Sequence, residues 1–258
     1  MTIWEAIILG LIQGLTEFLP VSSSGHLVFF QNVFKIYDGA LSFDIAVHFA
    51  TLLAVSAVLF EKIKALLKKP FTKLTFNIII SALPAVIIAF VFQSFLKSSF
   101  GGEYLGWGFL VSAVFLLIGD MVCKPTQKRL INSDLNSIST RQALIMGVFQ
   151  GIAVFPGVSR SGSTISAGLV SGQNRASSTE FSFLMSIPII LGAVVFDIVD
   201  IGVVHSNIGI GALIAGFLSA GISGYISAKI MLKIIARHAF WGFSVYLVLM
   251  SLLSFFLI

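Results

Sequence analysis

Charged residues are scarce in this chain of 258 residues. Lys, Arg, Asp and Glu together make up 10% of it, whereas hydrophobic residues make up 57% and the mean hydropathy is +1.02. Soluble domains carry about 25% charged residues, so this composition excludes a soluble globular protein and indicates an integral membrane protein. Apolar segments of about 20 residues favour helices over a β-barrel, whose strands alternate in polarity and are about half as long.

Cysteine is almost absent as well. Cys123 is the only one, which excludes an intramolecular disulfide, and we expect it to be a small buried hydrophobe. The first residues, MTIWEAIILG, lack a basic stretch, so we expect no cleaved signal peptide. The net charge of +5 says little about nucleic acid, because the cations gather in loops, where they set the orientation in the membrane. We expect no nucleic-acid partner.

Six segments are long enough to cross about 30 Å of hydrocarbon at 1.5 Å per residue. They are Ser42–Phe60, Thr75–Leu96, Tyr104–Cys123, Glu180–Asp200, Ile208–Leu232 and Ala239–Ile258. Thirteen of the 16 Lys and Arg residues lie in four of the connecting loops, against two in the others. This bias places those four loops in the cytoplasm and the C-terminus outside.

One sequence pattern occurs twice. The stretch Gly10–Leu27, GLIQGLTEFLPVSSSGHL, recurs at Gly147–Thr164 as GVFQGIAVFPGVSRSGST, with eight of 18 aligned positions identical. The first copy alone holds a carboxylate, Glu17, and an imidazole, His26, and the second copy alone holds a guanidinium, Arg160. We therefore interpret the two copies as meeting to make one site between them.

Neither copy fits a simple span. A helix over Ile7–Phe18 would cover only about 18 Å before Pro20 and the SSSG run break it. Irregular backbone at that depth must be buried in protein or line a wet cavity, so each copy is predicted to be a re-entrant helical hairpin. Three spans separate the hairpins, so the first enters from outside and the second from inside. We predict an all-α polytopic membrane protein, a single domain of six transmembrane helices plus two re-entrant helical hairpins, with inverted-topology repeats at about 1–135 and 138–258.

Arg160 is the only Lys or Arg that lies far from every loop. A cation at the bilayer centre costs roughly 2.5 to 17 kcal/mol, so Arg160 needs an anionic partner. The guanidinium fork fits phosphate bidentately, although a structural ion pair with Glu17 is the alternative. The neighbouring hydroxyls, which can bind the remaining phosphate oxygens at a helix start, are those of Ser159, Ser161, Ser163 and Thr164.

The first copy supplies the groups for proton transfer. Gln13 and Glu17 lie one turn apart on the same helix face. Glu17 can act as a base or a metal ligand, and His26 can exchange a proton near neutral pH, with a core imidazole as the alternative. The hydroxyls that can bind phosphate or attack it, or simply cap a helix, are those of Ser22, Ser23 and Ser24.

Other polar residues are weaker candidates. Asp44 and His48, one turn apart on the first predicted span, are predicted either to form a second layer behind the site or to be an interfacial pair. Glu180 is predicted to cap the start of its span. Asp120 is predicted to face other helices or Lys124.

Four stretches of the chain resemble one known family. QGLTEFLPVSSSGHL resembles the glutamate-rich first signature of the undecaprenyl-diphosphate phosphatase (bacitracin-resistance) family, and PGVSRSGST resembles its second signature. FDIAVHFATLLAV and FSFLMSIPIILGA also resemble family segments, so the resemblance covers nearly the whole chain. It implies hydrolysis of the terminal phosphate of a C55 polyprenyl diphosphate in the bacterial inner (plasma) membrane. The product is the monophosphate carrier used in cell-wall synthesis.

The resemblance also implies a divalent cation, Mg or Ca, and an active site reached from the outer face. Gln13 stands where many members have a second Glu, so metal binding would fall on Glu17. A homodimer is left open. By motif position, the residues carried over as catalytic are Glu17, Ser23, His26 and Arg160, with Gln13 and Ser22 beside them.

Two other functions remain as alternatives. A transporter or flippase of polyprenyl phosphate is the first, because inverted repeats are associated with alternating access and the Arg160 cradle can hold a lipid phosphate without cleaving it. The second is another family of integral phosphatases with a PSGH-type motif. It fits poorly, because no matching His and Asp cluster follows SRSGST. For the phosphatase, the attacking group is water, Ser23 or His26.

Overall fold

The computed structural model describes residues 1–258 except 38, 100, 124–133, 202–207 and 235–237. The described residues form helices and their connections and contain no strand. In chain order the helices are α1 (Ile3–Phe18), α2 (Ser23–Phe34), α3 (Ala40–Val58), α4 (Phe60–Lys68), α5 (Lys73–Val91), α6 (Gln93–Ser99), α7 (Leu105–Val122), the 3₁₀ turn η1 (Leu135–Ser137), α9 (Thr140–Ile152), α10 (Arg160–Val170), α11 (Arg175–Ile201), α12 (Ile210–Ile234) and α13 (Trp241–Leu257).

Each copy of the repeated pattern forms two helices joined by a short break. In the first copy, α1 ends at Phe18 and Ser22 caps the start of α2, so that the break comprises residues 19–22. In the second copy, α9 ends at Ile152 and Ser159 caps the start of α10. The serine hydroxyl satisfies a backbone N–H of the following helix in both cases, which fixes where that helix begins.

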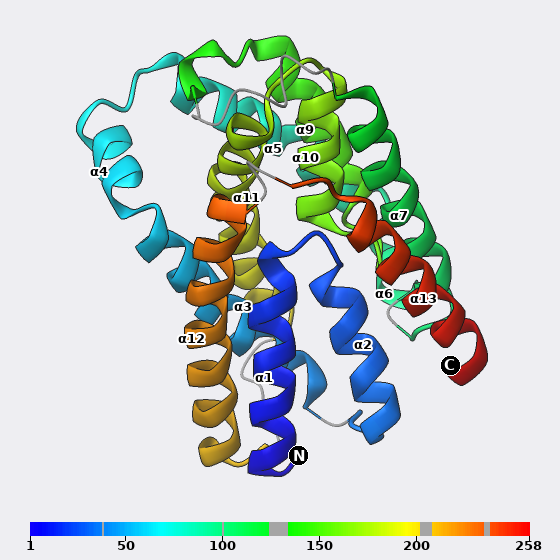
Figure 1. Cartoon of the computed structure of the whole chain (residues 1–258). Helices are drawn as coiled ribbons and strands as arrows, with labels where there is room; N and C mark the ends of the chain where they lie inside the picture. The colour runs from blue at the N-terminus through cyan, green and yellow to red at the C-terminus, as the bar shows by residue number, and fades with distance from the viewer. Residues whose placement is uncertain (38, 100, 124–133, 202–207, 235–237) are drawn as a thin grey trace.

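Both hairpins also begin alike. The Thr2 hydroxyl accepts from the backbone N–H of Glu5, whose carboxylate accepts from the N–H of Thr2. Ser139 and Gln142 make the same reciprocal pair at the start of α9. Such capping boxes satisfy two helix-end donors at once. Figure 1 shows the α1–α2 hairpin at the end of the molecule that holds the N-terminus, and α9 and α10 at the opposite end.

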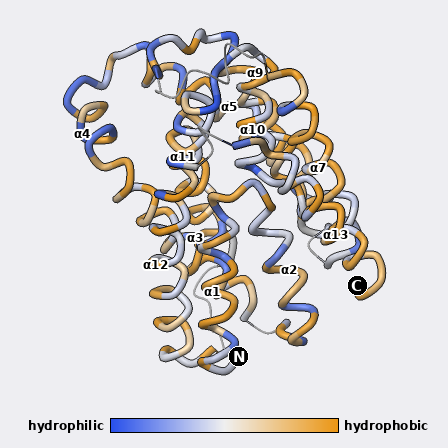
Figure 2. The backbone as a smooth tube through the Cα atoms, viewed as in Figure 1, coloured by the Kyte–Doolittle hydropathy of each residue, from blue (hydrophilic) through white to orange (hydrophobic). Residues whose placement is uncertain are grey.

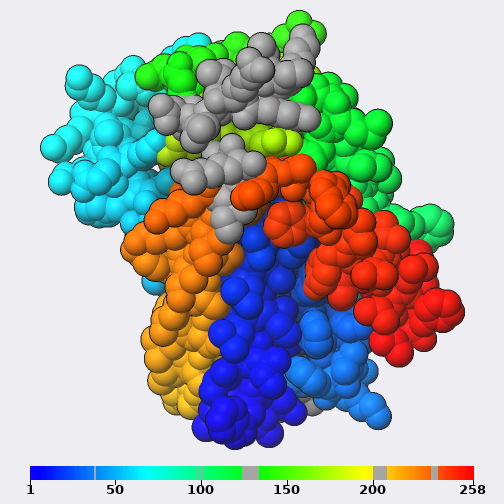
Figure 3. All heavy atoms as spheres, in the orientation of Figure 1, coloured from blue at the N-terminus to red at the C-terminus, as the bar shows by residue number. Residues whose placement is uncertain are grey.

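Glycines at matching positions of the two copies allow close helix packing. Gly10 and Gly14 lie where α1 crosses α12, and a Cβ at Gly10 would stand 2.4 Å from the carbonyl oxygen of Gly216. Gly147 and Gly151 lie where α9 crosses α5. A Cβ at Gly147 would stand 2.5 Å from the carbonyl oxygen of Ser81. Figure 3 shows α1 on one face of the molecule beside α12. Small residues four apart are typical of tightly packed membrane helices.

The remaining helices pair across the two halves of the chain. α3 packs against α11 and α12, and α7 packs against α13. Large apolar side chains cover much of the outer surface of these helices. Figure 2 shows polar segments gathered at the end that holds α4 and the start of α9, with apolar helices below them. This distribution is typical of a protein whose helices cross a bilayer.

Among the residues that the structure describes, five helices are long and apolar enough to cross a membrane: α3, α5, α7, α11 and α12. The sixth predicted span, Ala239–Ile258, contains α13, which has 17 residues and is shorter. The predicted span Thr75–Leu96 is wrong at its C-terminal end. There α5 ends at Val91, where the apolar run gives way to the polar residues of α6, QSFLKSS.

The predicted role of Glu180 is also wrong. Glu180 lies inside α11, which begins at Arg175, and its carboxylate pairs with Lys62 of α4. Asn174 stands immediately before this helix, and its side-chain oxygen accepts from the backbone N–H of Ser177. An asparagine is a strong N-cap, so the helix begins there and not six residues later.

We predict that Gly14→Ala destabilises the protein. The added Cβ would stand 2.5 Å from the carbonyl oxygen of Ala220 and 2.6 Å from the backbone nitrogen of Gly224. Overpacking of this kind costs about 1–3 kcal/mol, so the thermal unfolding midpoint in detergent, followed by circular dichroism, should fall.

Gly192→Ala is the matched control, because a Cβ at Gly192 of α11 has nothing within 4 Å. Its midpoint should stay the same or rise, since alanine favours a helix over glycine by about 1 kcal/mol. Equal midpoints for the two variants would contradict close packing at Gly14.

Candidate active site

The two hairpins touch at their breaks. The Ser161 hydroxyl, in the first turn of α10, donates to the carbonyl oxygen of Leu19 at 2.9 Å. One residue earlier, the Arg160 guanidinium reaches the Glu17 carboxylate, with 2.5 Å between Nη2 and Oε1. The meeting of the two pattern copies that the sequence predicts is therefore present. Both charged side chains are largely buried, with exposed fractions of 6% for Glu17 and 14% for Arg160.

Glu17 is the centre of a hydrogen-bonded cluster. Its Oε2 accepts from Nε2 of Gln13 at 3.0 Å and from the Ser23 hydroxyl at 2.6 Å, while Oε1 faces Arg160. Gln13 comes from the preceding turn of α1, and Ser23 is the first residue of α2. The break between α1 and α2 thus folds Ser23 back onto Glu17. Four predicted site residues come together here: Gln13, Glu17, Ser23 and Arg160.

Arg160 is fixed by the backbone that precedes it. Ser159, the cap of α10, donates its backbone N–H to the Ser112 hydroxyl of α7 at 2.7 Å. The same hydroxyl donates to the carbonyl oxygen of Gly157 at 3.2 Å. A Cβ at Gly157 would stand 2.6 Å from the carbonyl oxygen of Leu105, and its φ is +81°. Only glycine adopts that conformation easily so close to another backbone, so α7 holds the break that presents Arg160.

Two polar atoms beside Glu17 are buried without a hydrogen-bond partner among the residues that the structure describes. They are Nη1 of Arg160, a donor, and Oε1 of Gln13, an acceptor. A buried polar group without a partner costs about 1–3 kcal/mol, and native proteins contain few of them. One unpartnered donor and one unpartnered acceptor thus lie next to the same carboxylate.

His26 lies next to this cluster but faces another way. Its Nδ1 is 2.7 Å from the carbonyl oxygen of Ser22, and its Nε2 is 2.6 Å from the Tyr246 hydroxyl of α13. Ser22 has a φ of +70°, which is uncommon for a residue with a side chain. Strained backbone of this kind is often found at functional sites. His26 is thus a second polar centre at the start of α2, and its ring nitrogens bond to Ser22 and Tyr246 rather than to Glu17.

The hydroxyls predicted to bind phosphate are mostly engaged within the protein. Ser159 accepts from the backbone N–H of Gly162 at 3.1 Å, and Thr164 donates to the carbonyl oxygen of Arg160 at 2.8 Å. Ser163 is buried and has no partner in the described part of the chain. These hydroxyls shape the start of α10, and their contact with phosphate stays a prediction.

The serines of the first hairpin also differ in whether their hydroxyls bond within the protein. Ser22 accepts from the backbone N–H of Gly25 at 3.2 Å and so caps α2, as the alternative interpretation of these serines predicts. Ser23 bonds to Glu17. Ser24 follows in the first turn and is half-buried. Ser23 is therefore the hydroxyl of this run that joins the carboxylate.

The hydrogen bonds of the Asp44 and His48 side chains go to other groups than each other's side chain. The Asp44 carboxylate accepts from Nε2 of Gln31 at 2.7 Å, which joins α3 to α2. His48 approaches the backbone carbonyl oxygen of Asp44 instead, with 2.7 Å between that oxygen and Nδ1. A long glutamine from the neighbouring helix reaches the carboxylate, while the imidazole satisfies a carbonyl of its own helix. Their role as a second layer behind the site stays a prediction.

Two partners of the site are not predicted by the sequence. Ser112 and Tyr246 lie in apolar helices without a motif, so nothing in the sequence marks them. Farther from the site, the guanidinium of Arg175, the first residue of α11, pairs with Asp120 of α7. The prediction that Asp120 faces other helices is confirmed, and Lys124 lies outside the described residues. The one indication of this ion pair in the sequence is that Asp120 is a carboxylate in an apolar run and so needs a cationic partner.

Comparison with known proteins finds relatives that match nearly the whole chain. A family model described as "Bacitracin resistance protein BacA" matches residues 6–253. The chain is 39% identical over 250 residues to an undecaprenyl-diphosphatase of Carboxydothermus hydrogenoformans, covering 95% of this chain and 94% of that protein. It is 41% identical over 245 residues to undecaprenyl-diphosphatase 3 of Bacillus cereus, covering 94% and 92%. It is 36% identical over 278 residues to an undecaprenyl-diphosphatase of Methanobrevibacter smithii, covering 99% and 97%.

We predict that the Glu17–Arg160 pair is energetically coupled. Glu17→Gln or Arg160→Met alone leaves one buried charge without its partner, which costs about 3–5 kcal/mol. The double variant removes both charges and should lose less than the sum of the two single losses. Free energies of unfolding in detergent measure all three values.

Glu61→Gln is the control, because Glu61 lies on exposed α4 and its loss should change stability by less than about 0.5 kcal/mol. Strict additivity of the two site substitutions would show that the charges do not interact.

Proposed function

The chain belongs to the bacitracin resistance protein BacA family, and from this membership we infer that it is a membrane undecaprenyl-diphosphatase. It hydrolyses undecaprenyl (C55) diphosphate to undecaprenyl phosphate and inorganic phosphate, which returns the lipid carrier to cell-wall synthesis and confers bacitracin resistance. The names of the relatives support this hydrolase activity and give the transporter alternative no support. The structural observation that carries the proposal is the buried Glu17–Arg160 contact between the two hairpins.

Arg160 would bind the terminal phosphate. Its Nη1 is unpartnered among the described residues, whereas Nη2 is held by Glu17. A guanidinium anchored through one nitrogen keeps the other in a fixed direction, which suits an oxyanion. Phosphoryl transfer depends mainly on positioning and on stabilising charge around the phosphorus, and both come from an arginine that is buried and already oriented.

Glu17 and Ser23 have the geometry of a base and the group it activates. The Ser23 hydroxyl already donates to Glu17 at 2.6 Å, the reach that proton transfer requires. Either this hydroxyl or a water molecule in its place attacks the terminal phosphorus and passes its proton to Glu17. The anhydride P–O bond then breaks and undecaprenyl phosphate leaves. Where a protein side chain attacked, water then hydrolyses the phosphorylated side chain, which releases inorganic phosphate and restores the free group. His26, at the start of the same helix, would exchange the proton with solvent or with the leaving group, or attack the phosphorus itself.

A divalent cation fits the oxygens that are present. Magnesium usually binds one or two carboxylates together with phosphates of the substrate, and no group of three His, Cys, Asp or Glu side chains converges within the described residues. Glu17 and the unpartnered Oε1 of Gln13 would hold Mg or Ca jointly with the diphosphate. When bound, such a cation neutralises charge on the diphosphate during transfer.

The proposed topology has six membrane spans, with α13 as the sixth, and two re-entrant hairpins in an inverted repeat of about 1–135 and 138–258. Matching helix pairs support it: α1 packs on α12 as α9 packs on α5. The hairpins also approach from opposite ends of the molecule (Figure 1). The positive charge of the α4 end supports a cytoplasmic location for that end. The active site then opens to the outer face of the plasma membrane.

Phosphate release by the purified protein in detergent tests this function. Wild-type protein should release phosphate from undecaprenyl diphosphate and far less from inorganic pyrophosphate, which has no prenyl chain. Glu17→Gln should lower kcat by about 10²–10⁴-fold, the usual contribution of a general base. Ser98→Ala, on α6, is a control for serine loss and should match the wild type. Full activity of folded Glu17→Gln would exclude Glu17 as the base.

The cation is tested by chelation and by adding a carboxylate. EDTA should abolish phosphate release, and added Mg or Ca should restore it. Gln13→Glu places a second carboxylate beside Glu17 and should lower the cation concentration for half-maximal activity several-fold, because affinity follows the charge of the ligands. Gln93→Glu, which adds the same charge on α6, should leave that concentration unchanged. Undiminished activity in EDTA would remove the cation from the mechanism.

A further inference from the structure

One polar side chain of the last helix reaches the first hairpin. Tyr246 belongs to α13, 220 residues after His26, and its hydroxyl lies 2.6 Å from Nε2 of the imidazole. The neighbouring residues of α13 are almost all apolar, VYLVLM. Tyr246 lies outside both copies of the repeated pattern, and nothing in the activity described above uses its contact with His26.

The two partners of His26 define its protonation. The carbonyl oxygen of Ser22 can only accept a hydrogen bond, so Nδ1, 2.7 Å away, must carry a proton. In a neutral imidazole the other nitrogen is then an unprotonated acceptor. The Tyr246 hydroxyl therefore donates to Nε2. The pair of contacts selects one tautomer and leaves the lone pair of Nε2 directed at Tyr246.

Ring packing fixes the orientation of the imidazole as well. The Tyr246 ring stacks on it with 5.6 Å between centroids and 7° between planes. The Phe109 ring of α7 meets it edge-on, with a centroid distance of 5.4 Å and an angle of 77°. His26 is only 2% exposed. With both ring nitrogens bonded and a ring on two sides, the imidazole has no free rotation.

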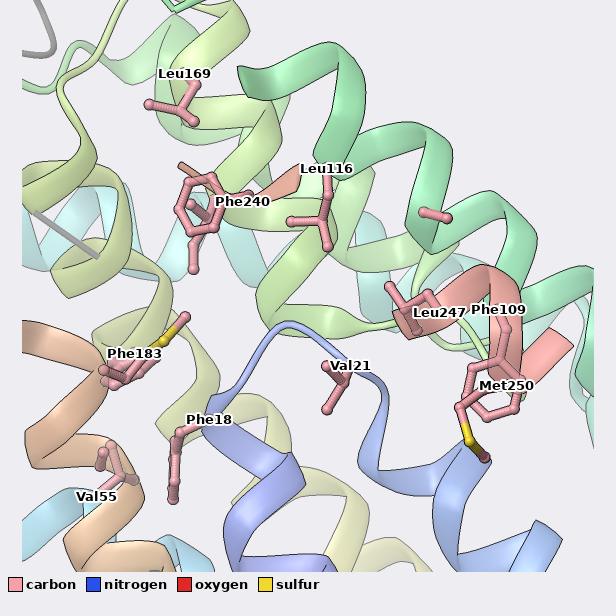
Figure 4. Close-up of a cluster of buried hydrophobic side chains, with 14 of the residues drawn as sticks. Phe18, Val21, Val55, Phe109, Leu116, Leu169, Phe183, Phe240, Leu247 and Met250 are labelled. Carbon is pink, nitrogen blue, oxygen red and sulfur yellow. The ribbon is translucent and has the colours of Figure 1, made fainter. Parts of the chain in front are cut away.

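The position of α13 is itself fixed. At its start, the backbone N–H of Phe240 donates to the Asp120 carboxylate at 2.7 Å. Arg175, which pairs with that carboxylate, stands 5.6 Å from the Phe240 ring centroid. Figure 4 shows Leu247 and Met250 of α13 beside Phe109, in the cluster that also contains Val21. Buried contacts on both sides of Tyr246 therefore hold it in place.

Tyr246 also borders an open apolar groove. This groove, of about 450 Å³, runs between the first hairpin and α13 and is lined mainly by apolar residues, among them Leu19, Val21 and Phe243. Tyr246 is 40% exposed there, whereas His26 behind it is buried. The tyrosine thus separates the imidazole from an apolar space, and its hydroxyl is bonded to the imidazole.

We propose that Tyr246 is the positioning residue of His26: it holds the imidazole in the Nδ1–H tautomer, in which Nε2 is the basic nitrogen and accepts the Tyr246 O–H. The proposal rests on the proposed function, because His26 acts in phosphoryl transfer only there. Tyr246 touches His26 and acts through it. Its effect should therefore appear in turnover, while binding of the diphosphate by Arg160 is unchanged.

Tyr246→Phe tests this with the smallest change, since the ring and its packing stay and only the hydroxyl is lost. Hydrolysis of undecaprenyl diphosphate in detergent should show a kcat about tenfold lower, the worth of one hydrogen bond, with KM unchanged. Tyr225→Phe is the matched control, because Tyr225 of α12 contacts Lys229 and lies outside the site. An unchanged kcat, or a loss confined to KM, would overturn the proposal.

The same substitution in a His26→Gln variant shows whether Tyr246 acts through His26 or only stabilises the fold. In His26→Gln protein, adding Tyr246→Phe should cause no further loss of kcat, because the tyrosine then has no imidazole to hold. The same tenfold loss in both backgrounds would show that Tyr246 acts independently of His26, against the proposal.

NMR of the imidazole nitrogens tests the tautomer without any turnover. In wild-type protein His26, identified among four histidines by its loss in His26→Gln, should have a protonated Nδ1 and a hydrogen-bonded, unprotonated Nε2. Tyr246→Phe should shift the Nε2 resonance alone. Protonated Nε2 in the neutral wild-type imidazole would overturn the proposal. If the expected tautomer is seen but wild-type protein releases no phosphate, the proposed function fails and the tyrosine contact stands.

Discussion

The ion pair between Glu17 and Arg160 is the constraint on which the rest of the structure depends. A single charge in the apolar interior of a membrane protein is costly, so each of these two side chains requires the other, and they come from opposite halves of the chain. Both helices that carry them must therefore stop at the same depth. The break after Phe18 and the break before Ser159 allow this. The need to neutralise both charges thus accounts for the end of α1 lying against the start of α10.

Holding two broken helices in register requires close packing around them. The glycines of α1 and α9 bring these helices against α12 and α5 with backbone contacts. Ser112 of α7 bonds to the backbone on both sides of Val158, so that α10 begins at Arg160. Ser161 then joins the second hairpin to Leu19 of the first. The result is a rigid scaffold in which Nη1 of Arg160 and Oε1 of Gln13, both beside Glu17, have no hydrogen-bond partner among the described residues.

The sequence predicts the contact between the two hairpins because burying a charged residue without a partner is energetically costly. Arg160 stood out because a buried cation needs an anion, and the repeat indicated Glu17 as the group opposite it. Tyr246 was not predicted, because its role depends on how α13 packs and an apolar helix carries no sign of that. The predicted start of the span at Glu180 is wrong because Asn174 is a better N-cap and begins α11 five residues earlier. Sequence patterns over a few residues thus predict the helices and the charged centre. Contacts between helices that are distant in the chain depend on how the whole fold packs, which those patterns do not contain.

The most direct measurement is an experimental structure of the protein with a non-hydrolysable undecaprenyl methylenediphosphonate. The account predicts terminal phosphonate oxygens within about 3 Å of Nη1 of Arg160 and of the Ser23 hydroxyl, with both hairpin tips still in contact. A diphosphonate bound elsewhere, with the Glu17–Arg160 pair untouched by the ligand, would contradict a phosphate site shared between the two hairpins.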